Sequence, residues 1–265
     1  MKEKIKLNIL LVILVLGIVS MTRLNEVKNN SSEKETLSKI KTFNFSSSGK
    51  TIKGKIYLPD SYKTNKNLPA IYLIDFTEQH FKLATDEFEK VIDGIKQKQG
   101  LDALVVSLDG IPDIDAEPET YQEHYNIFKN MASYVGDNYT SNTSLTFIGK
   151  GSESGVVLMT LFLEKPETSL FDNFIVTDPS PKYADAIINL IQNGNFPKNK
   201  HDKKLHYSFS TSNDRQKCIK LIRLIKESQY DWLQLESIEY TNSDYENTYP
   251  ISYAAGIKYI FNTYN

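Results

Sequence analysis

The stretch Thr146–Gly155 reads T-F-I-G-K-G-S-E-S-G and holds the residue most able to do chemistry, Ser152. It has the layout of a strand–turn–helix elbow, which presents a serine as a nucleophile in the pattern G-x-S-x-G. Small residues are needed two positions before and after the serine because the turn is sharp. Those positions are Lys150 and Ser154, of which only the serine is small. The pattern therefore predicts the elbow but departs from it at Lys150.

A serine hydroxyl becomes a good nucleophile only when a base lies within hydrogen-bond reach. The candidate bases are the four histidines of the chain: His80, His124, His201 and His206. We expect His201 and His206, which flank a lysine-rich turn, to be solvated, and His124 to be a surface or boundary residue of a helix. His80 follows a strand-like run, so it could approach the carboxyl edge of a sheet.

The composition narrows the possible functions. A length of 265 residues fits one large α/β domain with an N-terminal appendage. The formal net charge of -2 argues against broad attraction to nucleic acid, so we expect no nucleic-acid partner. The single cysteine, Cys218, excludes an intrachain disulfide and a cysteine-rich zinc site. It lies in an apolar helical run, where we expect it to be buried. We predict no cofactor.

The first residues resemble an export segment. Lys2, Lys4 and Lys6 precede the apolar run Leu7–Met21, and Arg23 follows it. A basic start before an apolar run is typical of a signal peptide or signal-anchor, and the lysines favour an amino end on the inner side of the membrane. We therefore expect residues 1–24 to be a signal peptide or signal-anchor and 25–41 a polar tether. The domain, residues 42–265, would then lie outside the cytoplasm, anchored to the membrane or released.

From residue 42 onward, strand-like and helix-like segments alternate. Two short alternating runs separated by Ser-Ser-Gly predict an antiparallel hairpin: Thr42–Ser47 and Thr51–Leu58. Further strands are expected at Leu68–Asp75, Leu104–Asp109, Leu145–Gly149, Asn173–Asp178, Leu205–Ser210 and Leu233–Tyr240. Helices are expected at Glu78–Gln97, Tyr121–Asn138, Ser152–Glu164, Lys182–Gln192, Asp214–Ser228 and Ile251–Phe261. This alternation predicts a mostly parallel sheet covered by helices on both faces.

One acidic loop follows an expected strand, and it holds Asp109, Asp113, Asp115 and Glu117. Oxygen ligands of this kind suit calcium. The loop lacks the central glycine and terminal glutamate of an EF-hand. Two interpretations stay open, a calcium site and a solvated acidic loop, and we favour the second, with no metal.

Several segments, in order, resemble the esterase family that includes esterase D, feruloyl esterases and enterochelin-esterase-like proteins. Tyr57–Tyr62 and Leu68–Asp75 are similar to its Y-L-P-x-x-Y and P-V-L-Y-L-L-D-G opening. Tyr134–Gly149 resembles its approach to the elbow, Glu164–Ser180 the stretch that follows, and Pro250–Phe261 its closing helix. The resemblance covers nearly everything from Thr51 onward. It implies an α/β-hydrolase fold with a Ser/His/Asp triad that acts on a carboxylic ester.

The departures from this family fall on the catalytic positions. Counted along the strand, the nucleophile position is Gly151, whereas counted back from the helix it is Ser152. The family's histidine lies eleven residues before the glycine of the last helix, and that position holds Tyr245 here. Because a tyrosine is normally protonated at neutral pH, it is a poor base.

The resemblance also implies an acid and an oxyanion hole. Asp214 stands roughly where the family places its triad carboxylate, although it could instead lie in the first turn of a helix capped by Ser212 or Asn213. The oxyanion donors would be backbone N–H groups near Phe76 and at Glu153. Phe76 replaces a glycine, and Glu153 adds negative charge where an oxyanion must be stabilised, so both oppose acyl transfer.

Two main hypotheses follow. The first is an exported, membrane-tethered esterase-like protein with a degenerate triad, which binds a small ester-like ligand or an envelope protein and hydrolyses esters weakly or not at all. The second is an active serine carboxylesterase that uses Ser152 and Asp214 with a base from elsewhere, such as His80. A third option is a structural or interaction module of the cell envelope.

Overall fold

A computed structural model describes residues 38–75, 86–109, 114–115, 117–194, 196 and 201–262. The predicted export segment, Phe76 and His80 lie outside these residues. No helix of the described part is both long and apolar enough to cross a membrane.

The strands form an eight-stranded sheet in the order β1-β2-β4-β3-β5-β6-β7-β8. Their bounds are β1 Ile40–Ser47, β2 Lys50–Tyr57, β3 Ala70–Leu73, β4 Leu104–Leu108, β5 Leu145–Lys150, β6 Asn173–Thr177, β7 Lys203–Ser210 and β8 Leu233–Tyr240. β2 runs antiparallel to β4, and the pairs from β4 to β8 are all parallel. Residues Ser48 and Gly49 both have positive φ, as a tight two-residue hairpin turn between β1 and β2 requires. The predicted hairpin and parallel sheet are confirmed.

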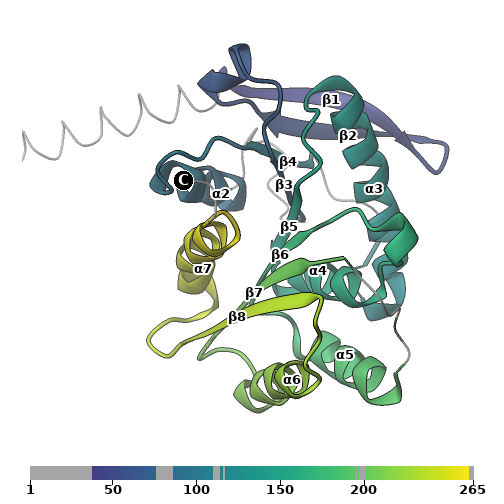
Figure 1. The fold of residues 1–265 in the computed structure, drawn as a ribbon, viewed down its shortest axis with the longest axis vertical. Coiled ribbons are helices and arrows are strands. Elements are labelled where there is room, and N and C mark those ends of the chain that lie inside the picture. The colour runs from purple at the N-terminus through teal and green to yellow at the C-terminus, as the bar shows by residue number, and fades with distance from the viewer. Residues whose placement is uncertain are drawn as a thin grey trace, which may run out of the picture. The chain divides into compact units, whose positions relative to one another are not determined.

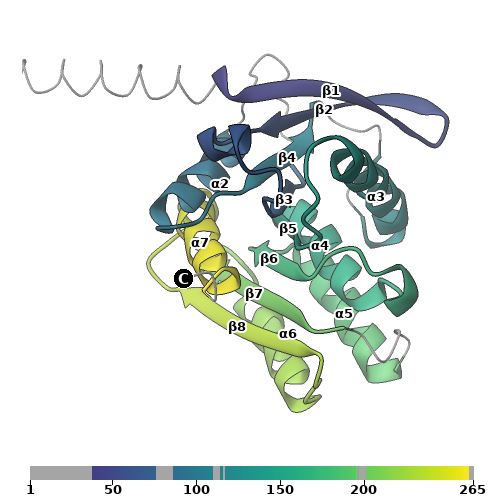
Figure 2. The ribbon, with the colours of Figure 1, turned by 45° about the horizontal axis from the view of Figure 1, so that its top comes forward.

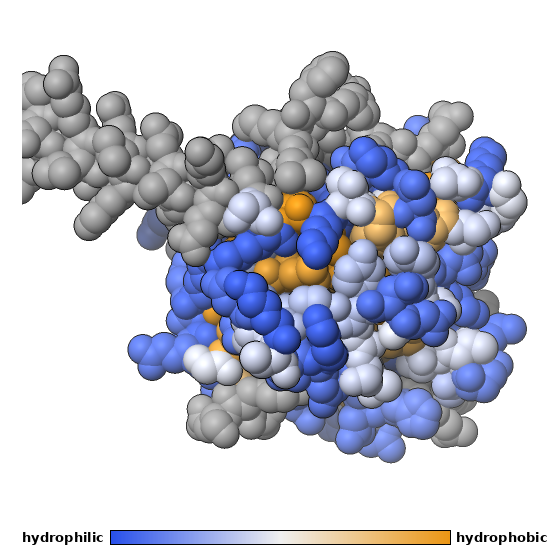
Figure 3. All heavy atoms as spheres, turned by 90° about the horizontal axis from the view of Figure 1, so that it is seen from above, coloured by the Kyte–Doolittle hydropathy of each residue, from blue (hydrophilic) through white to orange (hydrophobic). Residues whose placement is uncertain are grey.

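Helices cover both faces of the sheet, with α2 and α7 on one face and α3 to α6 on the other (Figure 1). Their bounds are α2 Asp86–Gln97, α3 Tyr121–Asn138, α4 Gly151–Leu163, α5 Pro181–Asn193, α6 Arg215–Glu227 and α7 Tyr245–Ile260. Short 3-10 turns occur at η1 Asp60–Lys63, η2 Pro118–Thr120 and η3 Pro166–Thr168. Seen from the β1–β2 end, the surface is mostly hydrophilic, with a smaller hydrophobic area near its centre (Figure 3).

The central strands are fully buried, and their common direction determines the edge of the sheet on which a site is expected. Tyr72 of β3 and Phe147 of β5 have no exposed surface, and Phe147 stacks on Phe171 with ring centroids 4.5 Å apart. Because all strands from β4 to β8 run the same way, their carboxyl ends lie on one edge of the sheet. Ligand sites of open α/β sheets lie at this edge.

One helix begins earlier than its sequence pattern indicates. We expected the last helix at Ile251–Phe261, but α7 begins at Tyr245. Asp244 is its N-cap, and the Asp244 side chain accepts a hydrogen bond from the backbone N–H of Asn247. Pro250, which suggested a helix start, lies inside the helix instead. The cap at Asp244 therefore stabilises a first turn of α7 that precedes the proline.

Candidate functional site

The tip of the turn between β5 and α4 is a glycine. β5 ends at Lys150 and α4 begins at Gly151, whose φ is +61°. That left-handed conformation suits glycine, because a Cβ is disfavoured there. A Cβ at Gly151 would also collide with the hydroxyl of Tyr245 and lie 3.2 Å from its Cζ. The tyrosine therefore fills the space in which a side chain at the tip would stand.

Ser152 is the next residue, in the first turn of α4, and it is half-buried. It lines a cavity of about 330 Å³ at the carboxyl edge of the sheet. The other lining residues are Gly151, Asp178, Ser180, Pro181, Ser212, Asn213 and Tyr245. No histidine of the described segments is among them. The structure thus brings Ser152 and Tyr245 to one cavity, without an imidazole from any described segment.

Tyr245 is a poor base at neutral pH. It is half-buried, and its backbone N–H donates to the Ser212 hydroxyl over 3.3 Å. Burial, and then the negative charges of Glu153 and Glu87, raise the pKa of the Tyr245 phenol well above its usual range. The hydroxyl therefore keeps its proton, and it can donate a hydrogen bond to a ligand.

The residue whose N–H is expected to stabilise an oxyanion carries an acidic side chain. Glu153 is half-buried in the first turn of α4. Burial, and then the nearby Asp75, raise the pKa of Glu153, whereas its own backbone N–H and Lys150 lower it, and the net shift is upward. Negative charge beside this N–H opposes the stabilisation of an oxyanion.

Lys150, the residue too large for the elbow pattern, extends towards two acidic side chains, one buried and one exposed. Its Nζ lies 3.3 Å from Oε1 of Glu87 and 3.6 Å from Oε2 of Glu246. The same ammonium lies 4.3 Å from the ring centroid of Tyr249 and 5.1 Å from that of Tyr245. The lysine therefore ties β5 to α2 and α7 behind the turn.

Glu87 is the buried one of these two acidic residues, with 4% of its surface exposed. Tyr253 donates to its Oε2 over 2.9 Å. Burial, and secondarily the charge of Asp75, raise the pKa of Glu87 to about 8, although Lys150 and Tyr253 act in the opposite direction. The sequence contained no sign of these contacts beyond the misplaced lysine.

Asp214, the predicted acid, caps a helix and does not line the cavity that Ser152 and Tyr245 share. It is exposed and is itself the N-cap of α6, where its side chain accepts from the backbone N–H of Lys217 over 3.1 Å. The expected cap at Ser212 or Asn213 is therefore wrong, because the helix begins after Asp214. The residues lining the cavity do not include Asp214.

The acid that lines the cavity is Asp178, directly after β6. It is 3% exposed, and its Oδ1 accepts from the Ser210 N–H at 2.7 Å, the Ser210 hydroxyl at 3.1 Å and Asn213 Nδ2 at 3.2 Å. Sequence reasoning treated this residue only as part of a family motif. An acid that directly follows a buried parallel strand was the signal that could have found it.

Two histidines are buried, contrary to expectation. His206 on β7 has no exposed surface, and its Nδ1 lies 2.8 Å from Oε2 of Glu236 on β8. His124 on α3 is also fully buried, and its Nε2 lies 3.1 Å from the carbonyl oxygen of Asp115. Polar flanking residues suggested solvent, but strand pairing and helix packing enclose both rings. Cys218 is buried, as predicted.

The acidic loop is described only in part, since Asp113 lies outside the described residues. Asp109 pairs with Lys53, with 2.5 Å between Oδ2 and Nζ, and Glu117 pairs with Lys182. Within the described segments, no group of three or more His, Cys, Asp or Glu residues could hold a metal ion.

Comparison with known proteins gives no match to a protein-family model or to a curated protein. Solved structures do match. An IroE-like serine hydrolase from Shewanella oneidensis has a TM-score of 0.67 and 15% identity, over 84% of this chain and 80% of that one. The siderophore hydrolase EstA from Aspergillus nidulans has a TM-score of 0.64 and 14% identity, over 85% and 95%. An uncharacterised protein from Capnocytophaga ochracea has a TM-score of 0.65 and 14% identity, over 85% of this chain and only 65% of that protein.

Feruloyl esterases and other esterases also match. The chain therefore has the α/β-hydrolase fold, and its structural neighbours are siderophore hydrolases, feruloyl esterases and esterases of that fold. At these sequence identities the likeness establishes the fold, and the chemistry has to be argued from the site itself.

Proposed function

We propose that this protein uses an esterase-like scaffold to bind a small ester-like molecule without hydrolysing it. The observation that carries the proposal is the pair formed by Gly151 and Tyr245, which puts a protonated phenol where an attacking hydroxyl would need room. Glu153 adds to this, because its acidic side chain puts negative charge beside the N–H that would stabilise the transition state. Five of the eight residues that line the remaining cavity carry a hydroxyl or an amide group, which can orient a polar ligand.

One observation favours the alternative, a serine carboxylesterase. Ser152 lies in the first turn of α4, half-buried, and lines the same cavity. Hydrolysis would then need a base from a segment such as the one that contains His80, which lies outside the described residues.

Short p-nitrophenyl esters and a fluorophosphonate probe distinguish the two functions. We expect the full chain to give neither turnover nor labelling, while a known serine esterase gives both in parallel. Turnover that disappears in Ser152→Ala would reject the non-hydrolytic proposal and support the carboxylesterase.

Binding is tested separately, with ethyl butyrate as the probe in saturation-transfer NMR. We expect a signal from the full chain and its loss in Ser180→Phe, because the new ring fills the cavity. Thr51→Phe, at an exposed position of β2, is the matched control and should keep the signal. A signal that survives Ser180→Phe would place binding elsewhere.

We further propose that the protein is exported and held at the membrane by residues 1–24. The support is the basic start and apolar run of the sequence. Cell fractionation checks this: the full chain should sediment with membranes, and a variant lacking residues 1–24 should not.

A further inference from the structure

The strand β8 forms one edge of the sheet, and its length and composition make it unusual as an edge. It runs for eight residues, Leu233–Tyr240, with the sequence L-Q-L-E-S-I-E-Y. Edge strands are usually protected from pairing by prolines, charged side chains, bulges or shortness. This strand has no proline, lysine or glycine, its only charged residues are Glu236 and Glu239, and it lies along the outside of the sheet between α6 and α7 (Figure 2).

The register of β8 against β7 shows which of its backbone groups are free. The N–H of Lys203 donates to the carbonyl of Trp232 over 2.7 Å, and Lys203 stands opposite Leu233. In a parallel ladder, the residues bonded to the neighbour then alternate along the strand. The N–H and C=O groups of the odd-numbered residues therefore face away from β7, namely those of Leu233, Leu235, Ser237 and Glu239.

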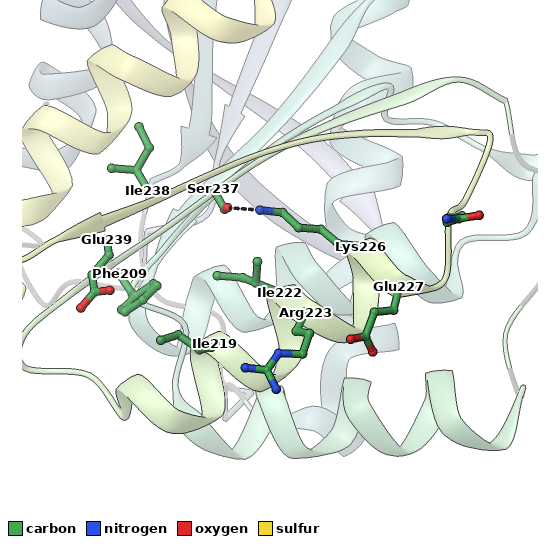
Figure 4. Close-up of a pocket in the computed structure, with 10 residues that line it drawn as sticks. Phe209, Ile219, Ile222, Arg223, Lys226, Glu227, Ser237, Ile238 and Glu239 are labelled. Atoms are coloured by element: carbon green, nitrogen blue, oxygen red, sulfur yellow. Dashed lines mark hydrogen bonds between the residues drawn. The ribbon is translucent and has the colours of Figure 1, made fainter.

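A groove of about 530 Å³ lies between α6 and β8, alongside this edge (Figure 4). Apolar side chains line part of it: Phe209, Ile219, Ile222 and Ile238. Its charged lining residues are two bases and two acids, Arg223, Lys226, Glu227 and Glu239. Lys226 reaches across the groove and donates to the hydroxyl of Ser237 over 3.2 Å. The groove is therefore apolar in part and balanced in formal charge.

We propose that β8 pairs with β8 of a second copy of this chain, antiparallel and around a two-fold axis at Ser237. Such an axis, normal to the sheet, sets residues with outward backbone groups opposite one another. Ser237 then meets its own counterpart, and Leu235 meets Glu239. Neither Glu236 nor Glu239 faces an equivalent carboxylate, whereas an axis centred on either residue would oppose two like charges. The balanced charge of the groove also adds no repulsion between identical faces.

This pairing goes beyond ligand binding and does not depend on it. It joins two sheets edge to edge and covers backbone groups that are otherwise exposed. The proposed pairing leaves the cavity at the carboxyl edge of the sheet open, because the two copies meet along the side of β8.

Cysteine crosslinking of the full chain, in mild detergent because of its apolar N-terminal run, tests the register. Two cysteines opposite each other in such a ladder lie within disulfide range. With copper phenanthroline as oxidant, Ser237→Cys should form a dimer on a non-reducing gel, whereas Leu235→Cys and Glu227→Cys should not. The native Cys218 is buried and serves as the background. Failure of Ser237→Cys to crosslink, or equal crosslinking of Leu235→Cys, would overturn the register.

Light scattering after gel filtration tests the dimer itself, with Ser237→Pro as the variant. A proline at an outward-facing position removes a hydrogen bond to the partner and leaves the β7 ladder intact. We expect the native chain to have twice the monomer mass and Ser237→Pro to be monomeric, with an unchanged circular dichroism spectrum. A monomeric native chain at all concentrations would overturn the proposal, as would a dimer that survives in a folded Ser237→Pro variant.

Discussion

At the scale of single residues, Gly151 and Tyr245 form a matched pair, and each sets what the other position tolerates. A side chain at Gly151 meets two obstacles, the left-handed backbone conformation and the tyrosine hydroxyl. Strain of the first kind costs about 1–2 kcal/mol, and overpacking adds about 1–3 kcal/mol. Only the second cost depends on the tyrosine.

Gly151→Ala should therefore destabilise the fold by about 2–5 kcal/mol. In the background of Tyr245→Ala the same substitution should cost only the backbone strain. Urea unfolding of the four proteins of this cycle measures the difference. Equal costs in both backgrounds would mean that the tyrosine does not fill the space at the tip.

Glu87 makes the folded protein less stable as the pH rises, which is the opposite of the usual effect of a carboxyl group that is ionised in the fold. Its pKa rises from an ordinary 4.5 to about 8 in the fold, so the folded state keeps a proton that the unfolded state has lost. Stability from this group is complete below about pH 4.5 and is lost as the pH rises towards 8.

The native chain should accordingly lose free energy of unfolding between these two pH values, by on the order of a few kcal/mol from this group. Glu87→Gln stays neutral and should lack that part of the slope. Urea titrations at several pH values, native against variant, give the comparison. Parallel pH profiles for the two proteins would show that Glu87 is ionised in the fold.

The sequence identified Ser152, Tyr245 and Lys150 as unusual positions, because a short motif and a family spacing point to them. It did not predict what Lys150 contacts. Glu87, Glu246 and Tyr249 come from two helices far apart in the chain, so their meeting depends on the packing of α2 and α7 against the sheet. Asp178 was missed for a similar reason, since its partners Ser210 and Asn213 lie at the end of a different strand, β7, and just after it.

At the scale of elements, local caps decide where the helices of the site begin. Asp214 and Asp244 each accept a hydrogen bond from the N–H three residues later, at the starts of α6 and α7. Only the second start brings a residue, Tyr245, into the cavity.

Asp244→Ala should cost about 1 kcal/mol of stability, as the loss of a cap usually does. It should also free the first turn of α7 and so increase the exposure of Tyr245, which hydroxyl-radical footprinting read by mass spectrometry at this residue reports. Asp214→Ala is the matched control, because it removes a cap of the same kind and should leave Tyr245 unchanged. Equal labelling of Tyr245 in both variants would contradict the positioning role.

Most elements could be predicted because buried parallel strands are continuous apolar runs and their helices are amphipathic. β8 and α3 have the predicted bounds, Leu233–Tyr240 and Tyr121–Asn138. The exception was α7, whose first turn is polar and whose interior proline imitates a helix start. There the side-chain cap at Asp244 outweighs the proline signal.

At the scale of the whole molecule, one buried ion pair joins parts that are distant in the chain. Lys203 at the start of β7 lies 2.8 Å from Glu164 after α4, and both side chains are buried. The ammonium also donates to the Ser169 hydroxyl over 2.7 Å and to the carbonyl of Phe171 over 2.5 Å. Charges buried in this way are tolerated only while each has its partner.

Glu164→Ala should leave the Lys203 ammonium buried without its carboxylate and cost about 3–5 kcal/mol. Lys182→Ala removes a lysine from a more exposed pair with Glu117 and should cost less than about 1 kcal/mol. Thermal unfolding of both variants measures the contrast. Similar losses of stability in the two variants would mean that the buried ion pair contributes no more to stability than the exposed one.

Gly155, one turn into α4, has a consequence for how this site could change over evolutionary time. A Cβ there would overlap the ring of Tyr183 on α5, so the missing methyl group sets how closely the two helices approach. The amino end of α5, with Ser180 and Pro181, is one wall of the cavity. A larger residue at Gly155 would push that wall outward and widen the cavity, so that it could take a bulkier ligand. The residues that line the cavity would be unchanged.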